Sequence, residues 1–296
     1  MKVSIIIVTY QSQDEILKCI SSIYKNIIDI EFEIIIIDNA STDNTIKIVK
    51  NHFSDVIIKE NKKNEGFARA NNAGSKIAKG EFLFFLNPDS KIIENTVEVL
   101  LSIYNSNPKN GIVAPQIKNI DGSIQLSTGK TPTIFTNLFE AFGLYIFLPN
   151  TFFGYRIATN HENELSTDWV TGACFLVKKE YFDKLNGFDK NFFLYLEDAD
   201  LCLRIKKEIN KNIIYTYKTS IIHAKAKSSK NSSYISKLSS YKSKIYYHKK
   251  HNGLLMYLGL IPLLYFAVLL KLVALTILFK DKEQIKSQLK VLTRLL

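Results

Sequence analysis

Polar side chains gather at four points of this 296-residue chain. Three of the groups follow short apolar runs: Thr9-Tyr10, the segment from Asp38 to Asp43, and Asn87-Pro88-Asp89. The fourth is the acidic group Glu197-Asp198-Ala199-Asp200. Carboxylate oxygens bind hard divalent cations and take protons from hydroxyl groups. Metal-assisted and acid–base chemistry are therefore the reactions that these residues can support.

The apolar runs before these polar groups have the pattern of a parallel β-sheet. Short β-branched segments at 3–8, 33–38, 56–60, 82–87 and 112–116 alternate with longer helical patterns. The continuous apolar run from Ile34 to Ile37 predicts a strand that helices cover on both faces. Ligands of such sheets bind at the carboxyl ends of the strands. We therefore expect one pocket to collect the first three polar groups.

The second half of the chain is less regular. Residues 121–164 are expected to form an irregular excursion within the same domain, followed by a strand at 169–177 and a helix from Lys179. A further helix is predicted from the acidic group to about Glu208. Carboxylates in a first helical turn are also favoured simply because they cap free N–H groups and complement the helix dipole.

The formal net charge of +11 is concentrated towards the C-terminus. Twelve lysines and no acidic residue lie between 209 and 280, four basic and two acidic residues follow, and residues 1–208 carry −3. The three cysteines lack the spacing of a disulfide framework or a zinc site, which favours a reducing compartment. The first apolar run is too short for a secretory signal, so a cytoplasmic location is expected.

Residues 254–279 are almost wholly apolar, interrupted by Pro262 and Lys271. About 20 such residues suffice to cross a bilayer. Lysines flank both ends, which favours a re-entrant hairpin or an in-plane helix over a single span. One alternative is a helix pair packed on the preceding domain. Another is a nucleic-acid-binding tail, since tyrosines lie among the lysines of 242–250. Because these lysines lie next to a long apolar segment, contact with anionic lipid headgroups explains both features. We therefore expect a membrane partner and no nucleic acid.

The order of the motifs resembles that of the family 2 glycosyltransferases with the GT-A fold. The segments are VSIIIVTY at 3–10, IDNASTD at 37–43, NEGFARANN at 64–72 and NPD at 87–89. TGA at 171–173 and EDAD at 197–200 are similar to the rhamnosyltransferase-like branch. The resemblance implies an α/β, Rossmann-like GT-A fold with a mixed, mainly parallel sheet. It divides the chain into a nucleotide-sugar half (1–116), an acceptor and catalytic half (117–225), and a basic, hydrophobic helical region that associates with the membrane (226–296).

The same resemblance implies an activity. The chain would transfer a sugar from a nucleotide diphosphate donor to a hydroxyl of a glycan or lipid-linked acceptor, with inversion at the anomeric carbon. Rhamnose from its thymidine diphosphate carrier is the first expectation for the donor. The implied setting is synthesis of a cell-surface polysaccharide at the cytoplasmic face of the membrane, with the protein peripheral or monotopic.

Donor contacts are implied for seven residues: Thr9, Tyr10, Asp38, Asn39, Arg69, Asn72 and Asn87. Asp38 would accept hydrogen bonds from the nucleoside, although an Asx turn at the start of its loop also explains an aspartate there. Arg69 would supply a fixed positive charge to the base or the diphosphate.

A divalent cation, Mg²⁺ or Mn²⁺, would neutralise the departing diphosphate. Asp89 is the expected ligand, and the resemblance implies His223 as a second one, because neutral imidazole suits that role. The family usually presents two acidic residues where this chain has Asn87 and Asp89, so metal affinity without donor should be weak. The alternatives are a simple turn at 87–89 and a structural histidine.

The resemblance places the base that deprotonates the acceptor in the Glu197-Asp198 pair. We choose Asp198, with Glu197 as the second choice; Asp200 is expected to point away and to be structural. On the acceptor side the expected residues are Trp169, Thr171 and Gly172. Trp169 would stack on an acceptor sugar, although a single tryptophan on a strand is more often part of the core.

Two other functions compete with glycosyl transfer. A sugar nucleotidyltransferase also combines an α/β sheet with a divalent metal, but it would normally carry a glycine-rich phosphate loop after the first strand, where this chain has Thr9-Tyr10-Gln11-Ser12. A non-enzymatic basic protein that binds nucleic acid or membranes is the second competitor.

Overall fold

The computed structural model describes residues 2–142, 164–224, 233–279 and 282–295. A mixed, mainly parallel sheet with the strand order β3-β2-β1-β4-β10-β6-β11-β5 forms its centre, and β8 pairs with β11 on one side. The strands are β1 Val3–Thr9, β2 Phe32–Asp38, β3 Ile57–Glu60, β4 Phe82–Leu86, β5 Ser90–Ile92, β6 Asn110–Lys118, β8 Leu165–Thr167, β10 Cys174–Lys178 and β11 Asn212–His223. The predicted α/β class and the apolar strands of the N-terminal half are thus confirmed.

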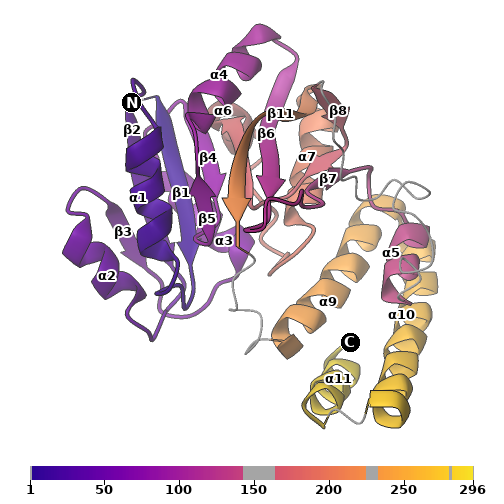
Figure 1. Ribbon diagram of the computed structural model, residues 1–296. Coiled ribbons are helices and arrows are strands. Elements are labelled where there is room, and N and C mark those ends of the chain that lie inside the picture. The colour runs from indigo at the N-terminus through magenta and orange to yellow at the C-terminus, as the bar shows by residue number, and fades with distance from the viewer. Residues whose placement is uncertain (1, 143–163, 225–232, 280–281, 296) are drawn as a thin grey trace.

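Helices cover both faces of this sheet, which explains the continuous apolar runs of its strands. One core cluster packs beneath α1 Ile16–Asn26, α2 Thr45–His52 and α4 Thr96–Ser106. The other packs beneath α3 Phe67–Ile77, α6 Lys179–Lys184 and α7 Glu197–Glu208. Figure 1 shows the resulting layers.

The parallel part of the sheet aligns the polar residues that end its strands. β1 lies between β2 and β4 and is parallel to both, and its register pairs Thr9 with Asp38. Because parallel strands end at the same edge, these two residues meet there.

The antiparallel part differs from the sequence expectation. The single strand predicted over 169–177 is two strands, β9 Trp169–Val170 and β10, with a turn at 171–173 between them. β9 leaves the main sheet to pair with β7 Thr128–Gly129, and β10 inserts antiparallel between β4 and β6. The turn packs closely against α3, since a Cβ on Gly172 would lie 3.1 Å from the ring of Phe67.

The C-terminal helices form a separate layer beside the sheet (Figure 1). They are α9 Ser233–Asn252, α10 Leu254–Ala274, a π-helical turn Leu275–Phe279 and α11 Lys282–Arg294. Together with α5 Ile134–Ala141 they enclose a third apolar cluster that includes Tyr241, Leu264 and Val291. α5 belongs to the predicted catalytic half, so the two regions share a core; the predicted boundary at 225/226 lies outside the described residues.

α10 buries one face and exposes the other. Leu260, Leu264 and Val268 are at most 1% exposed, whereas Leu255 is 87% and Phe266 53% exposed. The segment Tyr257–Ile277 is long and apolar enough to cross a membrane by length and composition alone.

Candidate active site

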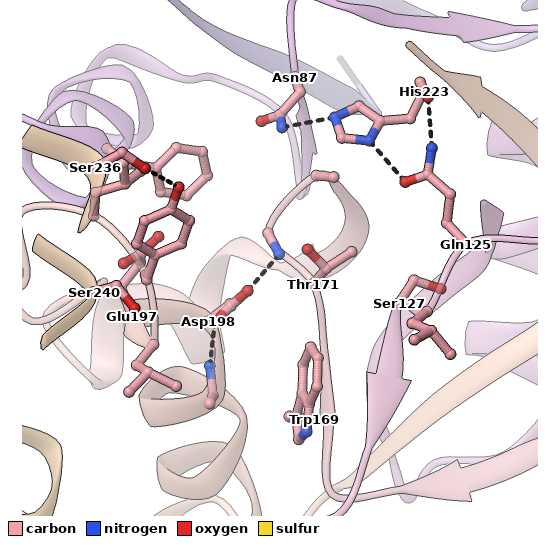
Figure 2. A pocket seen from close by; sticks show the side chains of 18 of the residues that line it. Asn87, Gln125, Ser127, Trp169, Thr171, Glu197, Asp198, His223, Ser236 and Ser240 are labelled. Carbon is pink, nitrogen blue, oxygen red and sulfur yellow. Dashed lines mark hydrogen bonds between the residues drawn. The ribbon is translucent and has the colours of Figure 1, made fainter. Parts of the chain in front are cut away.

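A cavity of about 740 Å³ opens between the antiparallel part of the sheet, the start of α7 and the helix α9. Its lining includes seven residues singled out from the sequence: Asn87, Trp169, Thr171, Gly172, Glu197, Asp198 and His223. Figure 2 shows this cavity with His223 on one side and Asp198 near its centre. Residues from distant parts of the chain therefore share one space of substrate size.

Strand pairing brings Asp89 to His223. β5 begins at Ser90, which is the antiparallel partner of His223 on β11. The Ala224 N–H donates to the carbonyl oxygen of Asp89 over 2.9 Å, and the Asp89 Oδ1 lies 3.1 Å from His223 Nε2. Asn87 completes the group, with its Nδ2 3.3 Å from the same Nε2. The side chains of Asp89 and His223 are only 13–14% exposed.

Gln125 sets the orientation of the His223 ring. The Gln125 Nε2 donates to the His223 carbonyl over 2.6 Å, so its Oε1 faces His223 Nδ1 at 3.1 Å and accepts a hydrogen bond from it. A proton on Nδ1 leaves the Nε2 lone pair directed at Asp89 and Asn87. Such a partner on the far nitrogen is what usually fixes the tautomer of a metal-binding histidine.

This donor set fits a divalent cation. Two ligands about 2.1 Å from an octahedral ion and at right angles lie about 3 Å apart, close to the separation of Asp89 Oδ1 and His223 Nε2. The described part of the chain contains no group of three or more His, Cys, Asp or Glu residues arranged for a metal. An ion here would therefore take its remaining ligands from water and from a bound diphosphate.

Backbone contacts hold the Asp198 carboxylate in place in the cavity. Its Oδ2 accepts the Gly172 N–H over 2.8 Å, and its Oδ1 accepts the N–H of Ala199 over 2.7 Å. The second contact resembles capping of the first helical turn, so the structural interpretation of this aspartate holds in part. The carboxylate is half-buried and lines the cavity, so it combines a fixed position with access to a ligand.

The turn that delivers Asp198 has an unusual backbone. Tyr195 and Leu196, immediately before α7, have φ angles of 73° and 65°. Non-glycine residues in this left-handed region each cost about 1–2 kcal/mol. Two such residues in succession need support from their surroundings.

α9 supplies that support. The Ser243 hydroxyl donates to the Leu194 carbonyl over 2.8 Å, and the Tyr195 hydroxyl lies 2.6 Å from Ser236 Oγ. We call these two contacts the α9 clasp.

A buried charge network ties the other end of α9 to α7. Asp200, fully buried, accepts hydrogen bonds from Arg204, Lys250 and His251 at 2.6–2.8 Å. Burial opposes ionisation, but the hydrogen bond from His251 and the charges of Arg204 and Lys250 hold the pKa of Asp200 below its ordinary value. Asp200 is thus structural, as expected from its spacing.

Glu197 differs from Asp198 in its surroundings. It is 4% exposed, and its Oε2 has no hydrogen-bond partner among the described residues. Burial, together with the negative charges of Asp198 and Asp200, raises the pKa of the Glu197 carboxyl well above its ordinary value. Burial thus disfavours the charged carboxylate form that a general base needs, which favours Asp198 for that role.

The carboxyl ends of β1 and β2 form a second polar group outside the lining of the cavity. Asp38 Oδ1 accepts from the hydroxyls of Thr9 (2.7 Å) and Ser41 (2.6 Å), and its Oδ2 accepts the Ser41 N–H over 2.8 Å. Asp38 therefore stabilises its own loop through the N–H three residues on, whereas an Asx turn would use the N–H two residues on. The Asn39 side chain makes hydrogen bonds within the protein. Its Nδ2 donates to the Gly66 carbonyl oxygen, and its Oδ1 accepts from the Asn61 amide. Tyr10 is 42% exposed beside them.

Arg69 and Asn72 on α3 do not line the cavity. The Asn72 amide donates to the Phe188 carbonyl over 2.7 Å and accepts the Phe188 N–H over 2.9 Å, so it fixes the turn after α6. Both ends of the Asn72 amide are thus occupied within the protein, as are both ends of the Asn39 amide. Arg69 is exposed, with its Nε donating to the Lys190 carbonyl over 3.1 Å.

Comparison with known families identifies the chain. The model of the family "Glycosyl transferase family 2" matches residues 4–185, more than half of the sequence. The chain belongs to this family.

Two curated glycosyltransferases illustrate its similarity to known members. The low-salt glycan biosynthesis hexosyltransferase of Haloferax volcanii is 27% identical over 214 residues, which are 71% of this chain and 63% of that protein. The N-acetylglucosaminyl-diphospho-decaprenol L-rhamnosyltransferase of Mycobacterium tuberculosis is 27% identical over 209 residues, which are 66% and 67% of the two chains. The chain thus matches about two thirds of the length of these relatives.

Solved structures show the same fold. The crystal structure of residues 1–349 of TarS from S. aureus has a TM-score of 0.53 at 18% identity and covers 82% of this chain and 65% of that one. GalNAc-T7 with UDP, GalNAc and Mn²⁺ has a TM-score of 0.58 at 16% identity and covers 76% and 44%. At such identities the likeness concerns the fold alone.

The structure adds lining residues of this glycosyltransferase that the sequence reasoning missed. Gln125 lies in the excursion that had no readable pattern. Ser236, Ser240 and Lys244 lie on α9, in the segment interpreted only as a membrane contact. Their spacing of four, on one helical face, is the signal that was available in the sequence.

Proposed function

We propose that this glycosyltransferase moves a sugar from a nucleoside diphosphate to a hydroxyl of a glycan or lipid-linked acceptor, with inversion at the anomeric carbon. The observation that carries the proposal is the single cavity that Asp198 and His223 both line, with Asp89 in contact with His223. A diphosphate at the His223 side and an acceptor at Asp198 would hold one sugar between them.

In this reaction Asp198 accepts the proton of the acceptor hydroxyl while the hydroxyl oxygen bonds to the anomeric carbon. The bond from that carbon to the diphosphate oxygen breaks on the opposite face, and the electron pair leaves with the nucleoside diphosphate. The hydrogen bond from Gly172 keeps the Asp198 carboxylate in place.

A divalent cation, Mg²⁺ or Mn²⁺, would be held by Asp89 and His223. When bound it neutralises charge on the diphosphate. Gln125 keeps the His223 ring oriented, and Asn87 adds an amide beside it. Thr9, Tyr10, Asp38 and Asn39 at the neighbouring strand ends, together with Arg69 and Asn72 on α3, remain the proposed contacts of the nucleoside part. Trp169 and Thr171 remain the proposed contacts of the acceptor.

The donor that we propose is thymidine diphosphate rhamnose. Support comes from the name of the mycobacterial relative, which acts as an L-rhamnosyltransferase on a diphospho-decaprenol-linked sugar. The same name supports a lipid-linked acceptor in glycan assembly.

The proposed location is the cytoplasmic membrane surface. The exposed face of α10 is apolar, with Leu255, Leu258, Phe266 and Val273 each more than half exposed. Lysine-rich helices α9 and α11 pack along its other face, and charged partners of this kind are costly in hydrocarbon. We therefore expect α10 to lie in the plane of the membrane. Its exposed leucines would then lie in the membrane interface, and the lysines of the neighbouring helices would contact anionic headgroups.

A donor screen tests the proposal. Full-length protein in detergent with Mg²⁺ is mixed with different nucleotide sugars, and thermal shift identifies binders because ligand binding raises the apparent stability. Turnover of a binder should release nucleoside diphosphate. Release of pyrophosphate from a sugar phosphate and a nucleoside triphosphate would instead support the nucleotidyltransferase.

A further inference from the structure

One face of α9 forms part of the cavity wall. Ser236, Ser240 and Lys244 are spaced by four residues and all line the cavity that contains Asp198. Residues four apart lie on the same side of a helix. We call these three residues the α9 stripe.

The α9 stripe combines an ammonium group with hydroxyls in a secluded place. Lys244 is only 6% exposed, although lysine is rarely buried. Its Nζ lies 5.9 Å from the centre of the Tyr241 ring. Ser236 is oriented by the Tyr195 hydroxyl at 2.6 Å. An ammonium and hydroxyl donors that line one cavity are a suitable set for the oxygens of a phosphate group.

The position of the stripe separates it from the proposed donor diphosphate. Figure 2 shows Ser236 and Ser240 on one side of Asp198, and His223 with Gln125 on the other. Because the base must lie next to the acceptor hydroxyl, a group bound beyond Asp198 belongs to the acceptor. Burial raises the pKa of Glu197, the other acidic residue of this part of the lining, and so disfavours its charged form.

We propose that the α9 stripe binds a phosphate group of the acceptor, with Lys244 as its charged contact. This inference rests on the proposed glycosyl transfer and adds the chemical class of the acceptor. The phosphate has two possible sources, the diphosphate of a lipid-linked sugar or a phosphodiester of a polymer. α9 also packs against α10 through Tyr241 and Leu264, so the stripe lies on the helix that joins the cavity to the proposed membrane-facing helix.

Binding is measured without turnover. Full-length protein in detergent is first saturated with Mg²⁺ and nucleoside diphosphate to fill the donor site, and citronellyl diphosphate is then titrated by calorimetry. Lys244→Met should weaken binding about tenfold or more, because hydrogen bonds to charged groups contribute about 1.5–3 kcal/mol. Lys244→Arg should retain most of the affinity. Lys242→Met, on the exposed side of the same helix, is the matched control and should bind like the wild type.

Two results would overturn the inference: no binding by the wild-type protein, or equal affinity of the wild type and Lys244→Met. A dialkyl phosphodiester probe in place of the diphosphate separates the two sources, since the tighter-binding probe identifies the class of acceptor. A different result would contradict the proposed glycosyl transfer, namely that no nucleotide sugar gives release of nucleoside diphosphate. The calorimetric result does not depend on that release.

Discussion

Two neighbouring carboxyl groups at the start of α7 have different environments. Asp198 accepts backbone N–H groups at the cavity, whereas Glu197 is buried with a raised pKa. Environment rather than residue type thus favours Asp198 over Glu197 as the proposed base.

Asp198→Asn should reduce the rate of transfer by roughly 10²–10⁴-fold, the usual contribution of a general base. The donor should still bind with nearly wild-type affinity, because the substitution preserves shape and leaves the His223 side of the cavity intact. Steady-state kinetics and donor calorimetry measure the two effects. Near-wild-type turnover would place the base elsewhere.

Glu197 should make stability depend on pH. Its pKa is raised in the folded protein above the ordinary value of 4.5, so its stabilising contribution is complete below about 4.5 and is lost as the pH rises towards the folded value. Glu197→Gln removes this dependence. The melting temperature of the variant, relative to that of the wild type, should therefore increase between pH 5 and pH 8. A constant difference between the two melting temperatures across this interval would contradict the raised pKa of Glu197.

At the scale of elements, the pairing of β5 with β11 creates the proposed metal site and Gln125 maintains it. Gln125→Leu removes the acceptor for His223 Nδ1. Loss of such a partner typically costs 10–100-fold in metal affinity, so the Mg²⁺ or Mn²⁺ concentration for half-maximal activity should rise by about that factor. Nucleoside affinity without metal serves as the control. An unchanged metal requirement would show that His223 is structural.

The α9 clasp should affect catalysis more than stability. Tyr195→Phe removes the hydrogen bond to Ser236 beside the strained turn. One hydrogen bond contributes about 0.5–1.5 kcal/mol, so kcat should fall by about threefold to tenfold with donor affinity unchanged. Tyr24→Phe is the matched control, since its hydroxyl donates to Asp55 on a distant surface. If both variants lose only stability, the clasp does not position Asp198.

For the whole molecule, the exposed apolar face of α10 predicts membrane binding. Leu255 and Leu258 are 87% and 53% exposed, and burial of one leucine contributes about 1.5–3 kcal/mol. The double substitution of both by Glu should lower binding to anionic vesicles at least tenfold in a flotation assay. Ile28→Glu, at a 58% exposed site beside α1, is the control. Equal flotation of all three proteins would exclude this face as the contact.

Elements with strong local patterns could be predicted from the amino-acid sequence. The apolar runs of β1 and β2 predicted buried parallel strands, and the polar residues at their ends, Thr9 and Asp38, do meet. The helix from Glu197 to Glu208 was also predicted with its bounds. Side-chain periodicity and strand-end chemistry are local properties, so they can be read from neighbouring residues.

Tertiary structure alone decided which distant segments meet. The insertion of β10 between β4 and β6, the pairing that joins Asp89 to His223, and the wall formed by α9 all depend on contacts between segments far apart in sequence. Gln125 lies in an irregular stretch, where periodicity carries no information about partners. Pairing of strands is selected by the packing of the whole core, because a strand's own pattern specifies its faces and not its neighbours.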